Sequence, residues 1–333
     1  MKQHAIIPIF IPHLGCPHDC VFCNQKQMTH QETPVTPDGV PAILEAHLST
    51  LEGRKIKTVE AAFYGGSFTG LPFELQSAYL SQLKPFKEEG RIQKIHLSTR
   101  PDLIDEEILS NLLDWGVDVI ELGVQSFDEK VLALSRRGHS RESIYRSARL
   151  IQDAGFTLGI QLMIGLPGDT RDTSVESARQ TAVIKPALAR IYPTIVLPET
   201  ELEHQYLSGF YQPPTLSQAV ETARDMHLIL LSAGVQVIRA GLKDDYHPAF
   251  HQLVQSEMAK VQLEQQLREL LPSGPSCTVT FFANRKCFSN LSGHQKSNRT
   301  YFQTNYPGLR FRYQEDQALP DDRYRVILLP AGV

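Results

Sequence analysis

Short runs of β-branched and apolar residues alternate with segments of helical periodicity, and this alternation constrains the fold more than any other feature of the chain. Regular alternation favours parallel strands joined by right-handed crossovers, which close into a full or partial barrel. Such barrels carry their chemistry at the carboxyl ends of the strands. The runs predict strands near residues 5–12, 58–64, 92–99, 117–124, 157–164, 188–197 and 235–239. Helical spacing predicts helices near residues 38–51, 73–84, 105–114, 128–136, 141–154, 172–183 and 216–233.

Two of the predicted helices begin at a capping pattern. Ser126-x-x-Glu129 precedes the helix near 128–136, and Thr215-x-x-Gln218 precedes the helix near 216–233. In a capping box, a hydroxyl and a carboxylate or amide three residues later bond to each other's backbone N–H groups. We therefore expect both patterns to start helices.

Three cysteines follow the first predicted strand. Cys16, Cys20 and Cys23 lie within eight residues of one another. Thiolates ligate 4Fe-4S clusters at one per iron, so three of them leave one iron open to another ligand. A zinc site completed by His13 or His18 is an alternative, although no second cysteine pair with knuckle spacing follows downstream. Three buried cysteines without a metal are the remaining interpretation.

Composition is that of an ordinary globular protein. The 333 residues are 41% hydrophobic and 21% charged, with a formal net charge of −4, so any contact to nucleic acid must come from a local patch. The remaining cysteines, Cys277 and Cys287, are expected to be free thiols, as suits the reducing cytoplasm. The N-terminus has no features of a signal peptide, and we expect neither a membrane span nor membrane binding.

Polar residues interrupt the ends of the predicted strands. Gly65-Gly66-Ser67 follows the second, where paired glycines permit close backbone approach to a ligand or simply form a tight turn. Other candidates are Glu121, Gln125 and Gln161 on apolar strands and Arg136 and Arg137 at a helix end. Buried polar groups need partners, which a ligand or neighbouring strands could supply. The arginines could equally be a solvated helix end.

These residues together carry a resemblance to a known family. The cysteine trio, Gly65-Gly66-Ser67, Thr99-Arg100-Pro101-Asp102, residues 121–126, Arg137-Gly138-His139 and residues 191–194 resemble the radical S-adenosylmethionine superfamily. They are most similar to the radical domain of the Elongator catalytic subunit, from about residue 5 to about residue 242. The resemblance implies a partial (β/α)6 barrel of the TIM type, an α/β fold. It also implies a 4Fe-4S cluster that cleaves S-adenosylmethionine reductively to methionine and a 5′-deoxyadenosyl radical.

The resemblance assigns roles to individual residues. Cys16, Cys20 and Cys23 would ligate the cluster. Gly65, Gly66 and Ser67 would hold the amino group of S-adenosylmethionine, Gln125 and Arg137 its ribose and carboxylate, and Thr99 is a further cofactor-binding candidate. Two residues depart from the family pattern. Ser98 stands where relatives often carry glutamate, and Gln161 stands where the oxygen-independent coproporphyrinogen oxidases carry aspartate. Reduction of the cluster would require an electron donor such as flavodoxin or ferredoxin.

Two residues beyond the cofactor candidates are weak catalytic candidates. In the Elongator-like interpretation Tyr192 faces the substrate as a hydrogen-bonding or hydrogen-atom-relay group, and Arg239 clamps an anion. Alternatively, Tyr192 packs in the barrel and Arg239 closes a salt bridge.

Beyond the barrel, the composition changes. We expect domains at 1–245 (radical barrel), 246–272 (an amphipathic helix docked on the barrel) and 273–333 (a small α+β appendage). Residues 276–314 contain no Asp or Glu. They could bind RNA through cations and stacked rings, or the rings could fill a core of their own. The cations are Arg285, Lys286, Lys296, Arg299, Arg310 and Arg312, and the rings are Phe281, Phe282, Phe288, Tyr301, Phe302, Tyr306, Phe311 and Tyr313.

The sequence therefore predicts a radical enzyme that modifies tRNA or another RNA. The residues after Pro272 show no Gly-rich acyl-CoA loop, so we do not expect the acetyltransferase part of the Elongator enzyme here. One alternative is radical chemistry on a small molecule such as a tetrapyrrole precursor. Another is a non-catalytic RNA-binding module that carries a cluster or zinc.

Overall fold

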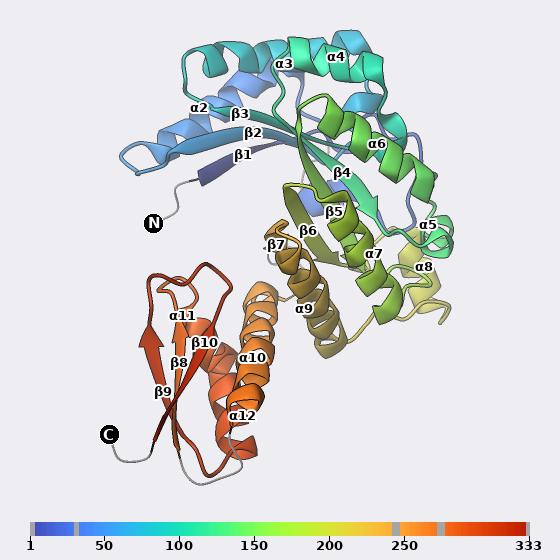
Figure 1. Cartoon of the computed structure of the whole chain (residues 1–333). Coiled ribbons are helices and arrows are strands. Elements are labelled where there is room, and N and C mark those ends of the chain that lie inside the picture. Colours follow the sequence, from blue (N-terminus) through green and yellow to red (C-terminus); the bar gives the residue numbers. More distant parts are fainter. Residues whose placement is uncertain (1–3, 30–32, 242–246, 272–276, 331–333) are drawn as a thin grey trace. The chain divides into compact units, whose positions relative to one another are not determined.

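The computed structural model describes residues 4–29, 33–241, 247–271 and 277–330 (Figure 1). It divides into two compact units. We call residues 1–214 and 229–239 the barrel unit, and residues 215–228 and 240–333 the C-terminal unit. The domain limits expected from the sequence, 1–245, 246–272 and 273–333, fall within 242–246 and 272–276, outside the described residues, and stay a prediction.

The barrel unit contains one curved sheet of seven strands in the order β1-β2-β3-β4-β5-β6-β7 (Figure 1). Strands β1 to β6 pair in parallel. The α/β partial barrel of the TIM type is thus confirmed, and each strand lies within a few residues of its prediction. The strands are His4–Phe10, Thr58–Tyr64, Lys94–Thr99, Val119–Gln125, Thr157–Ile164, Leu188–Pro193 and Gln236–Ala240.

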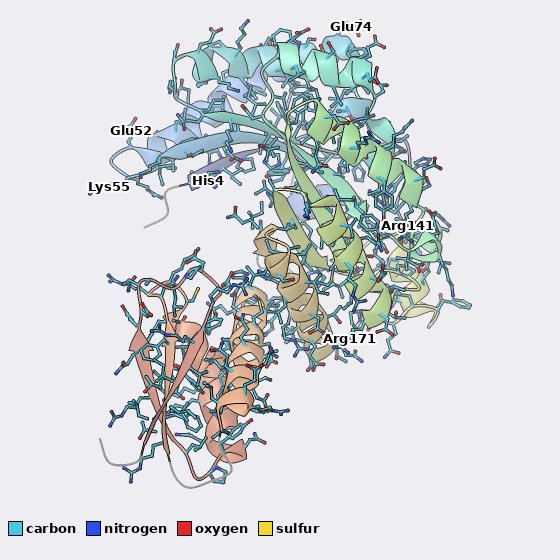
Figure 2. The ribbon with its side chains drawn as sticks, viewed as in Figure 1. His4, Glu52, Lys55, Glu74, Arg141 and Arg171 are labelled. Atoms are coloured by element: carbon cyan, nitrogen blue, oxygen red, sulfur yellow. The ribbon has the colours of Figure 1, made fainter. Side chains whose placement is uncertain are left out.

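The expected helices are present between the strands. They are α2 (Val40–Leu51), α3 (Phe73–Glu88), α4 (Glu106–Asp114), α5 (Glu129–Leu134), α6 (Arg141–Asp153), α7 (Arg171–Ile184) and α9 (Leu216–Ser232). The sequence did not predict two shorter helices, α1 (Gln25–Thr29) and α8 (Glu201–Leu207). Charged side chains such as Glu52, Lys55 and Glu74 project from the outer surface of the barrel unit (Figure 2).

The strands of the barrel have an apolar face and a polar face. Side chains alternate between the two faces of a sheet, so residues two apart share a face. The face toward the helices forms the core, and its residues include Ile7, Ile9, Ala61, Phe63, Ile95, Leu97, Ile120, Leu122, Ile160, Leu162 and Ile191, each at most 1% exposed. The opposite face lines the inside of the half-barrel, which we call the lumen. Its polar residues are described below.

One of the two predicted capping boxes is present and the other is wrong. Thr215 Oγ1 accepts from Gln218 N at 3.3 Å, and Gln218 Oε1 accepts from Thr215 N at 2.9 Å. Helix α5 is instead capped by Asp128, whose carboxylate accepts from Val131 N at 3.0 Å. Ser126 Oγ accepts from the N–H of Asp128 at 3.1 Å, so the serine lies before the cap.

The C-terminal unit packs helices on one side of a small sheet. Strand β8 (Cys277–Ala283) lies between β10 (Arg325–Pro330), which is antiparallel to it, and β9 (Arg310–Glu315), which is parallel. Helices α10 (Phe250–Leu270), α11 (Phe288–Ser292) and α12 (Ser297–Asn305) complete the unit. Ala259, Leu263 and Leu267 of α10 belong to the same core as the sheet, so α10 is an integral part of this unit.

The aromatic rings of the basic segment mostly fill this core, as the second of the two interpretations of residues 276–314 expected. Phe281 and Phe302 are completely buried, with ring centroids 4.8 Å apart. Phe288, Tyr301, Tyr306, Phe311 and Tyr313 pack against the same core. The basic residues of the segment, from Arg285 to Arg312, are all exposed. Composition could not distinguish the two outcomes, because strand alternation decides which side chains turn inward.

Among the described residues, no helix combines the length and the apolar character that crossing a membrane requires.

Candidate metal and cofactor site

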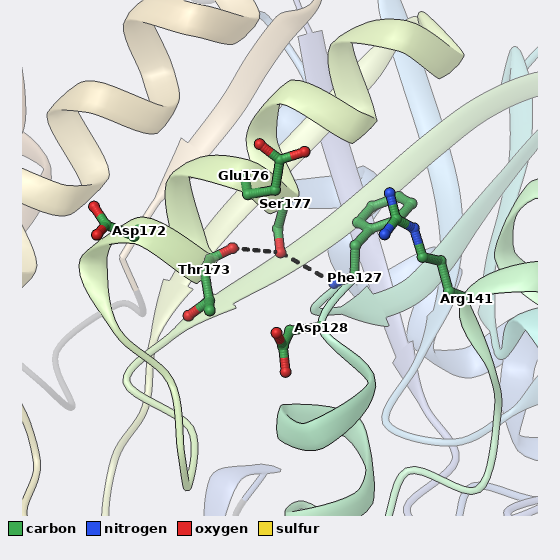
Figure 3. A pocket seen from close by; sticks show the side chains of 7 residues that line it. All are labelled: Phe127, Asp128, Arg141, Asp172, Thr173, Glu176 and Ser177. Carbon is green, nitrogen blue, oxygen red and sulfur yellow. Dashed lines mark hydrogen bonds between the residues drawn. The ribbon is translucent and has the colours of Figure 1, made fainter.

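A pocket of about 200 Å³ lies beside the first turns of α6 and α7 (Figure 3). Ser177 Oγ at its wall accepts from the N–H of Phe127 at 3.0 Å and donates to Thr173 O at 2.9 Å. The lining residues are Phe127, Asp128, Arg141, Asp172, Thr173, Glu176 and Ser177. None of them is a cysteine or a predicted site residue, so the predicted chemistry belongs elsewhere.

The three cysteines lie on the loop that follows β1. The loop folds on itself through bonds from Cys16 N to His13 O at 3.3 Å and from Cys23 N to Cys20 O at 3.0 Å. All three thiols are free and half-buried. Among the described residues, no three His, Cys, Asp or Glu side chains are placed to hold a single metal ion. The ligands of a 4Fe-4S cluster bind different irons and are therefore spaced by the width of the cluster.

The two histidines considered as zinc ligands have other contacts. His13 Nε2 accepts from the N–H of Gln25 at 3.0 Å, and the N–H of His13 bonds in return to the side-chain oxygen of Gln25. The ring of His18 lies against the backbone of Gly138, where an added Cβ would overlap it. Both rings are thus used in packing the loop.

The environment of the thiols is suited to a positively charged metal group. Burial, together with the neighbouring Cys20 and Cys16, raises the pKa of Cys23 to about 12. Burial also raises the pKa of Cys16, and the Ser67 hydroxyl, 3.3 Å from its Sγ, partly offsets this. Bound iron would reverse the balance, because a metal cation stabilises its ligands as thiolates.

Glycines join the cysteine loop to the turn after β2. Gly65 has φ +88°, and its carbonyl accepts from His13 N at 2.9 Å. A Cβ on Gly66 would lie 2.5 Å from Leu14 O, and Ser67 N donates to that same carbonyl at 2.9 Å. A Cβ on Gly15 would overlap the carbonyl of Ser67. The loop and the turn therefore pack backbone to backbone, which requires glycine at Gly15, Gly66 and Gly70, since a Cβ on Gly70 would overlap Gly15 O.

Arg137 connects the cysteine loop to the end of β4. Its Nη1 donates to Cys20 Sγ at 3.1 Å, and its Nη2 donates to Gly123 O. Gln125 stands at a register shift of β4 with φ +69°. A Cβ on Gly123 would lie 3.2 Å from Gln125 Nε2, so this glycine leaves room for the two side chains. Backbone strain of this kind clusters at ligand sites.

Two buried polar atoms beside the cysteines have no partner in the described part of the chain. They are Gln125 Oε1, a hydrogen-bond acceptor, and Arg137 Nε, a donor. Buried polar atoms are almost always bonded in folded proteins. A ligand with a hydroxyl and a carboxylate would satisfy both, which fits the ribose and the carboxylate of S-adenosylmethionine.

Thr99 is the last residue of β3. Its hydroxyl is hydrogen-bonded to Thr69, which in turn donates to Leu103 O at 2.6 Å. The side chain is only 3% exposed. Its predicted contact to a cofactor stays a prediction.

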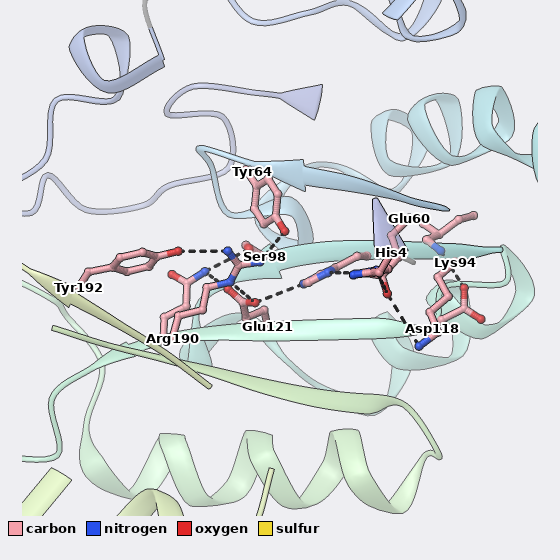
Figure 4. Close-up of polar contacts among 12 residues, drawn as sticks. His4, Glu60, Tyr64, Lys94, Ser98, Asp118, Glu121, Arg190 and Tyr192 are labelled. Atoms are coloured by element: carbon pink, nitrogen blue, oxygen red, sulfur yellow. Dashed lines mark hydrogen bonds and ion pairs between the residues drawn. The ribbon is translucent and has the colours of Figure 1, made fainter. Parts of the chain in front are cut away.

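A polar network occupies the lumen (Figure 4). Arg190 Nε donates to Glu121 Oε2 at 2.8 Å, its Nη2 to the Tyr64 hydroxyl at 2.8 Å and its Nη1 to the Tyr192 hydroxyl at 3.2 Å. The neighbouring Arg190 charge and the His96 contact together outweigh complete burial and lower the pKa of Glu121 to about 2. Gln161 bonds to Glu121 and, at 3.4 Å, to Ser98.

The network continues toward the amino ends of the strands. His96 lies 3.5 Å from Glu121 and 3.4 Å from Glu60, and Glu60 lies 3.0 Å from His4. These carboxylates raise the pKa of His96 against the effect of burial. The chain of polar contacts thus extends from Arg190 in the lumen to His4, whose side chain is 48% exposed.

The weak catalytic candidates both lie near this network. Tyr192 bonds to Arg190, and burial raises its pKa while the charges of Arg190 and Arg239 lower it. Their proposed roles toward a substrate stay predictions. The sequence interpretation missed Arg190, Tyr64, His96 and Glu60. A signal for them exists, because polar residues at every second position of a buried strand, such as Arg190 and Tyr192, mark a polar face.

The chain matches two family models. The radical SAM superfamily model matches residues 10–180, and a radical SAM C-terminal domain model matches residues 186–260. Among curated proteins, the chain is 26% identical over 255 residues to a tRNA uridine(34) acetyltransferase of Methanocaldococcus infernus, covering 65% of this chain and 48% of that protein. It is 24% identical over 292 residues to Elongator complex protein 3 of Homo sapiens, covering 70% and 53%. The chain spans about half the length of these relatives.

Solved structures show the same fold. An N-terminally deleted Elp3 of Methanocaldococcus infernus superposes with a TM-score of 0.60 at 21% identity, covering 78% of this chain and 64% of that one. Coproporphyrinogen III oxidase of Escherichia coli has a TM-score of 0.50 at 19% identity, covering 70% and 54%. The superfamily model matches over half of the chain's length, so the chain belongs to the radical SAM superfamily, and its barrel is similar to that of Elp3.

Proposed function

We propose that this radical SAM enzyme acts on tRNA or another RNA. Cys16, Cys20 and Cys23 would hold the 4Fe-4S cluster that the family implies. Gly65, Gly66, Ser67, Gln125 and Arg137 would hold S-adenosylmethionine. When bound, these groups supply the reductive cleavage of a sulfonium and thereby radical chemistry.

The observation that carries the proposal is the arrangement around Arg137. Its guanidinium contacts the Cys20 sulfur at 3.1 Å, while its Nε and the Oε1 of Gln125 are buried without a partner among the described residues. The arrangement offers one donor and one acceptor at the edge of a three-cysteine loop. That is the chemistry a cofactor with a carboxylate and a ribose hydroxyl requires at a cluster with one open iron.

We expect the substrate to bind in the lumen. Arg190 is buried, and its charge is compensated by Glu121. Its guanidinium also donates to the hydroxyls of Tyr64 and Tyr192. Tyr192 would donate a hydrogen bond to a reacting group, and Arg239 on β7, whose charge lowers the pKa of Tyr192, would contact an anionic group of the substrate.

RNA is the substrate class that the relatives and the charge pattern favour. Three of the similar curated proteins are named tRNA uridine(34) acetyltransferases. This chain carries exposed cations and no acid between residues 276 and 314. We therefore assign RNA as substrate and leave the modified atom unassigned.

The first experiment tests the radical reaction. Anaerobically prepared protein, reduced with dithionite, should convert S-adenosylmethionine to 5′-deoxyadenosine. Cys20→Ala should abolish the reaction, whereas Cys287→Ala removes a thiol from the C-terminal unit and should retain it. Equal turnover by Cys20→Ala and the unchanged protein would contradict the proposal.

The second experiment tests the substrate. Mass spectrometry of total tRNA nucleosides, from cells with and without this protein, should show one modified nucleoside that disappears with the gene and returns with the unchanged protein. The Cys20→Ala protein should not restore it. Identical nucleoside profiles, together with a changed small-molecule pool such as tetrapyrrole precursors, would overturn the RNA assignment.

A further inference from the structure

The sheet of the C-terminal unit has two faces that differ in chemistry. The registers align Val326, Phe281 and Tyr313 in one row and Leu328, Val279 and Phe311 in the next. These six side chains belong to the buried core or pack against it. Residues at intervening positions point to the opposite side of the sheet. We call that side the open face.

The registers also define the open face. Its three rows are Leu329–Thr278–Arg310, Ile327–Thr280–Arg312 and Arg325–Phe282–Gln314. The three arginines and Gln314 are exposed, as are Ile327 at 36% and Leu329 at 38%. None of the nine residues is acidic.

One aromatic ring of the basic segment lies on this face. Phe282 is half-buried, and the guanidinium of Arg325 lies 4.9 Å above its ring centroid. Arg325 is also paired with Asp316 at 2.6 Å, beyond the end of β9. The open face thus combines two arginines on an outer strand, a third arginine over a ring, and a central strand with Thr278 and Thr280, of which Thr280 is only 2% exposed.

The residues of the open face indicate which class of partner it binds. The face carries three arginines and no acid among its nine residues, so it favours an anionic partner. Arg310 and Arg312 lie about 6.6 Å apart along the strand, since each residue advances it by about 3.3 Å. That spacing allows each guanidinium to bind a different phosphate of an extended strand, and Arg is suited to bidentate phosphate contacts. Sheets that carry cations and aromatic rings on one face bind single-stranded RNA in this way.

We propose that the open face of the C-terminal sheet binds a single-stranded segment of the RNA substrate. Arg310 and Arg312 contact successive phosphates, and Phe282 with Arg325 receives a base. This inference rests on the proposed function, because it takes RNA as the substrate. Of the cations and rings that the sequence suggested for RNA binding, it keeps Arg310, Arg312 and Phe282 and leaves out the rings that fill the core.

The experiment compares two double variants that remove equal charge. Arg310→Gln with Arg312→Gln alters the open face, while Lys296→Gln with Arg299→Gln alters exposed cations at the start of α12. Binding of full-length protein to a labelled 12-nucleotide oligouridylate and to an unmodified tRNA transcript is measured by fluorescence anisotropy over a range of salt concentrations. Circular dichroism confirms that each variant is folded.

The open-face variant should bind both RNAs more weakly. Each phosphate contact to a single strand adds about 0.7 to the salt slope, so two lost contacts lower the slope by about 1.4. Near 0.15 M salt this corresponds to about tenfold weaker binding. The α12 variant should change binding less than threefold, and Phe282→Leu should weaken binding with an unchanged salt slope.

Equal losses of RNA affinity in the two double variants would overturn the proposal. Binding would then depend on the total positive charge and not on the position of the cations. Loss of binding to anionic phosphatidylserine vesicles but not to RNA would also overturn it. Formation of 5′-deoxyadenosine without RNA should be unchanged in the open-face variant. If the open-face variant bound RNA as tightly as the unchanged protein, and both formed 5′-deoxyadenosine, only the open-face proposal would be rejected. Formation of 5′-deoxyadenosine by Cys20→Ala would instead contradict the proposed function.

Discussion

Replacing Glu121 by glutamine tests the lumen network most directly. Glu121 is 1% and Arg190 is 6% exposed, and their charged atoms lie 2.8 Å apart. Removing one partner of such a buried pair costs about 3–5 kcal/mol, because the other charge is left without compensation. The lowering of the Glu121 pKa from 4.5 to about 2 corresponds to roughly 3 kcal/mol at neutral pH. We therefore expect Glu121→Gln to lower the free energy of unfolding by about 3 kcal/mol.

The sign of the pH dependence follows from the same shift. The folded-state pKa of Glu121 is depressed, so its contribution is fully present above pH 4.5 and is lost as the pH falls toward 2. The unchanged protein should lose this stability on acidification through that range. The Glu121→Gln variant should lack this part of the pH dependence.

The assay uses the single tryptophan of the chain. Trp115 lies in the barrel unit, so its fluorescence reports the unfolding of that unit by urea. Glu52→Gln is the matched control, because Glu52 is exposed on the surface and its change should stay within about 0.5 kcal/mol (Figure 2). Glu121→Gln combined with Arg190→Met removes both charges and should recover part of the loss. A loss below about 1 kcal/mol in Glu121→Gln, or a double variant no more stable than the single one, would refute the reasoning.

Two further predictions concern the cysteine loop and helix α5. Gly66→Ala should reduce the iron and acid-labile sulfide bound per chain, because the new Cβ would lie 2.5 Å from Leu14 O; Gly308→Ala, where the Cβ meets nothing within 4 Å, should leave both unchanged. Equal iron content in the two variants would contradict the packing argument. Asp128→Ala should destabilise the barrel unit by about 1 kcal/mol in the Trp115 assay, since Val131 N loses its cap, while Asp128→Asn should retain most of the stability.

The strands could be predicted because each is a local pattern. Runs such as Thr157–Ile164 are rich in branched apolar residues, and their alternation with helices favours one architecture. The cap of α5 could not be predicted, since both Ser126 and Asp128 are good capping residues and the backbone of residue 128 decides between them. Helix α8 spans only seven residues, too few to show a clear period.

The candidate site was predictable only in part. The cysteine spacing is a local feature, whereas the contact of Arg137 with Cys20 joins residues 117 positions apart. Glu121 was recognised as a polar residue on a buried strand, but its partner Arg190 is 69 positions away. The rings of the C-terminal unit needed the strand registers, since Phe281 and Phe282 are neighbours in sequence and lie on opposite faces.

The series of charges from His4 to Arg190 also has an evolutionary consequence. Each member is balanced by the next, so the energetic effect of changing one depends on the residue beside it. A lineage that loses an acid here retains a buried cation without a counterion. Divergence inside this lumen must therefore proceed through coordinated pairs of substitutions, while the surface around it can drift one residue at a time.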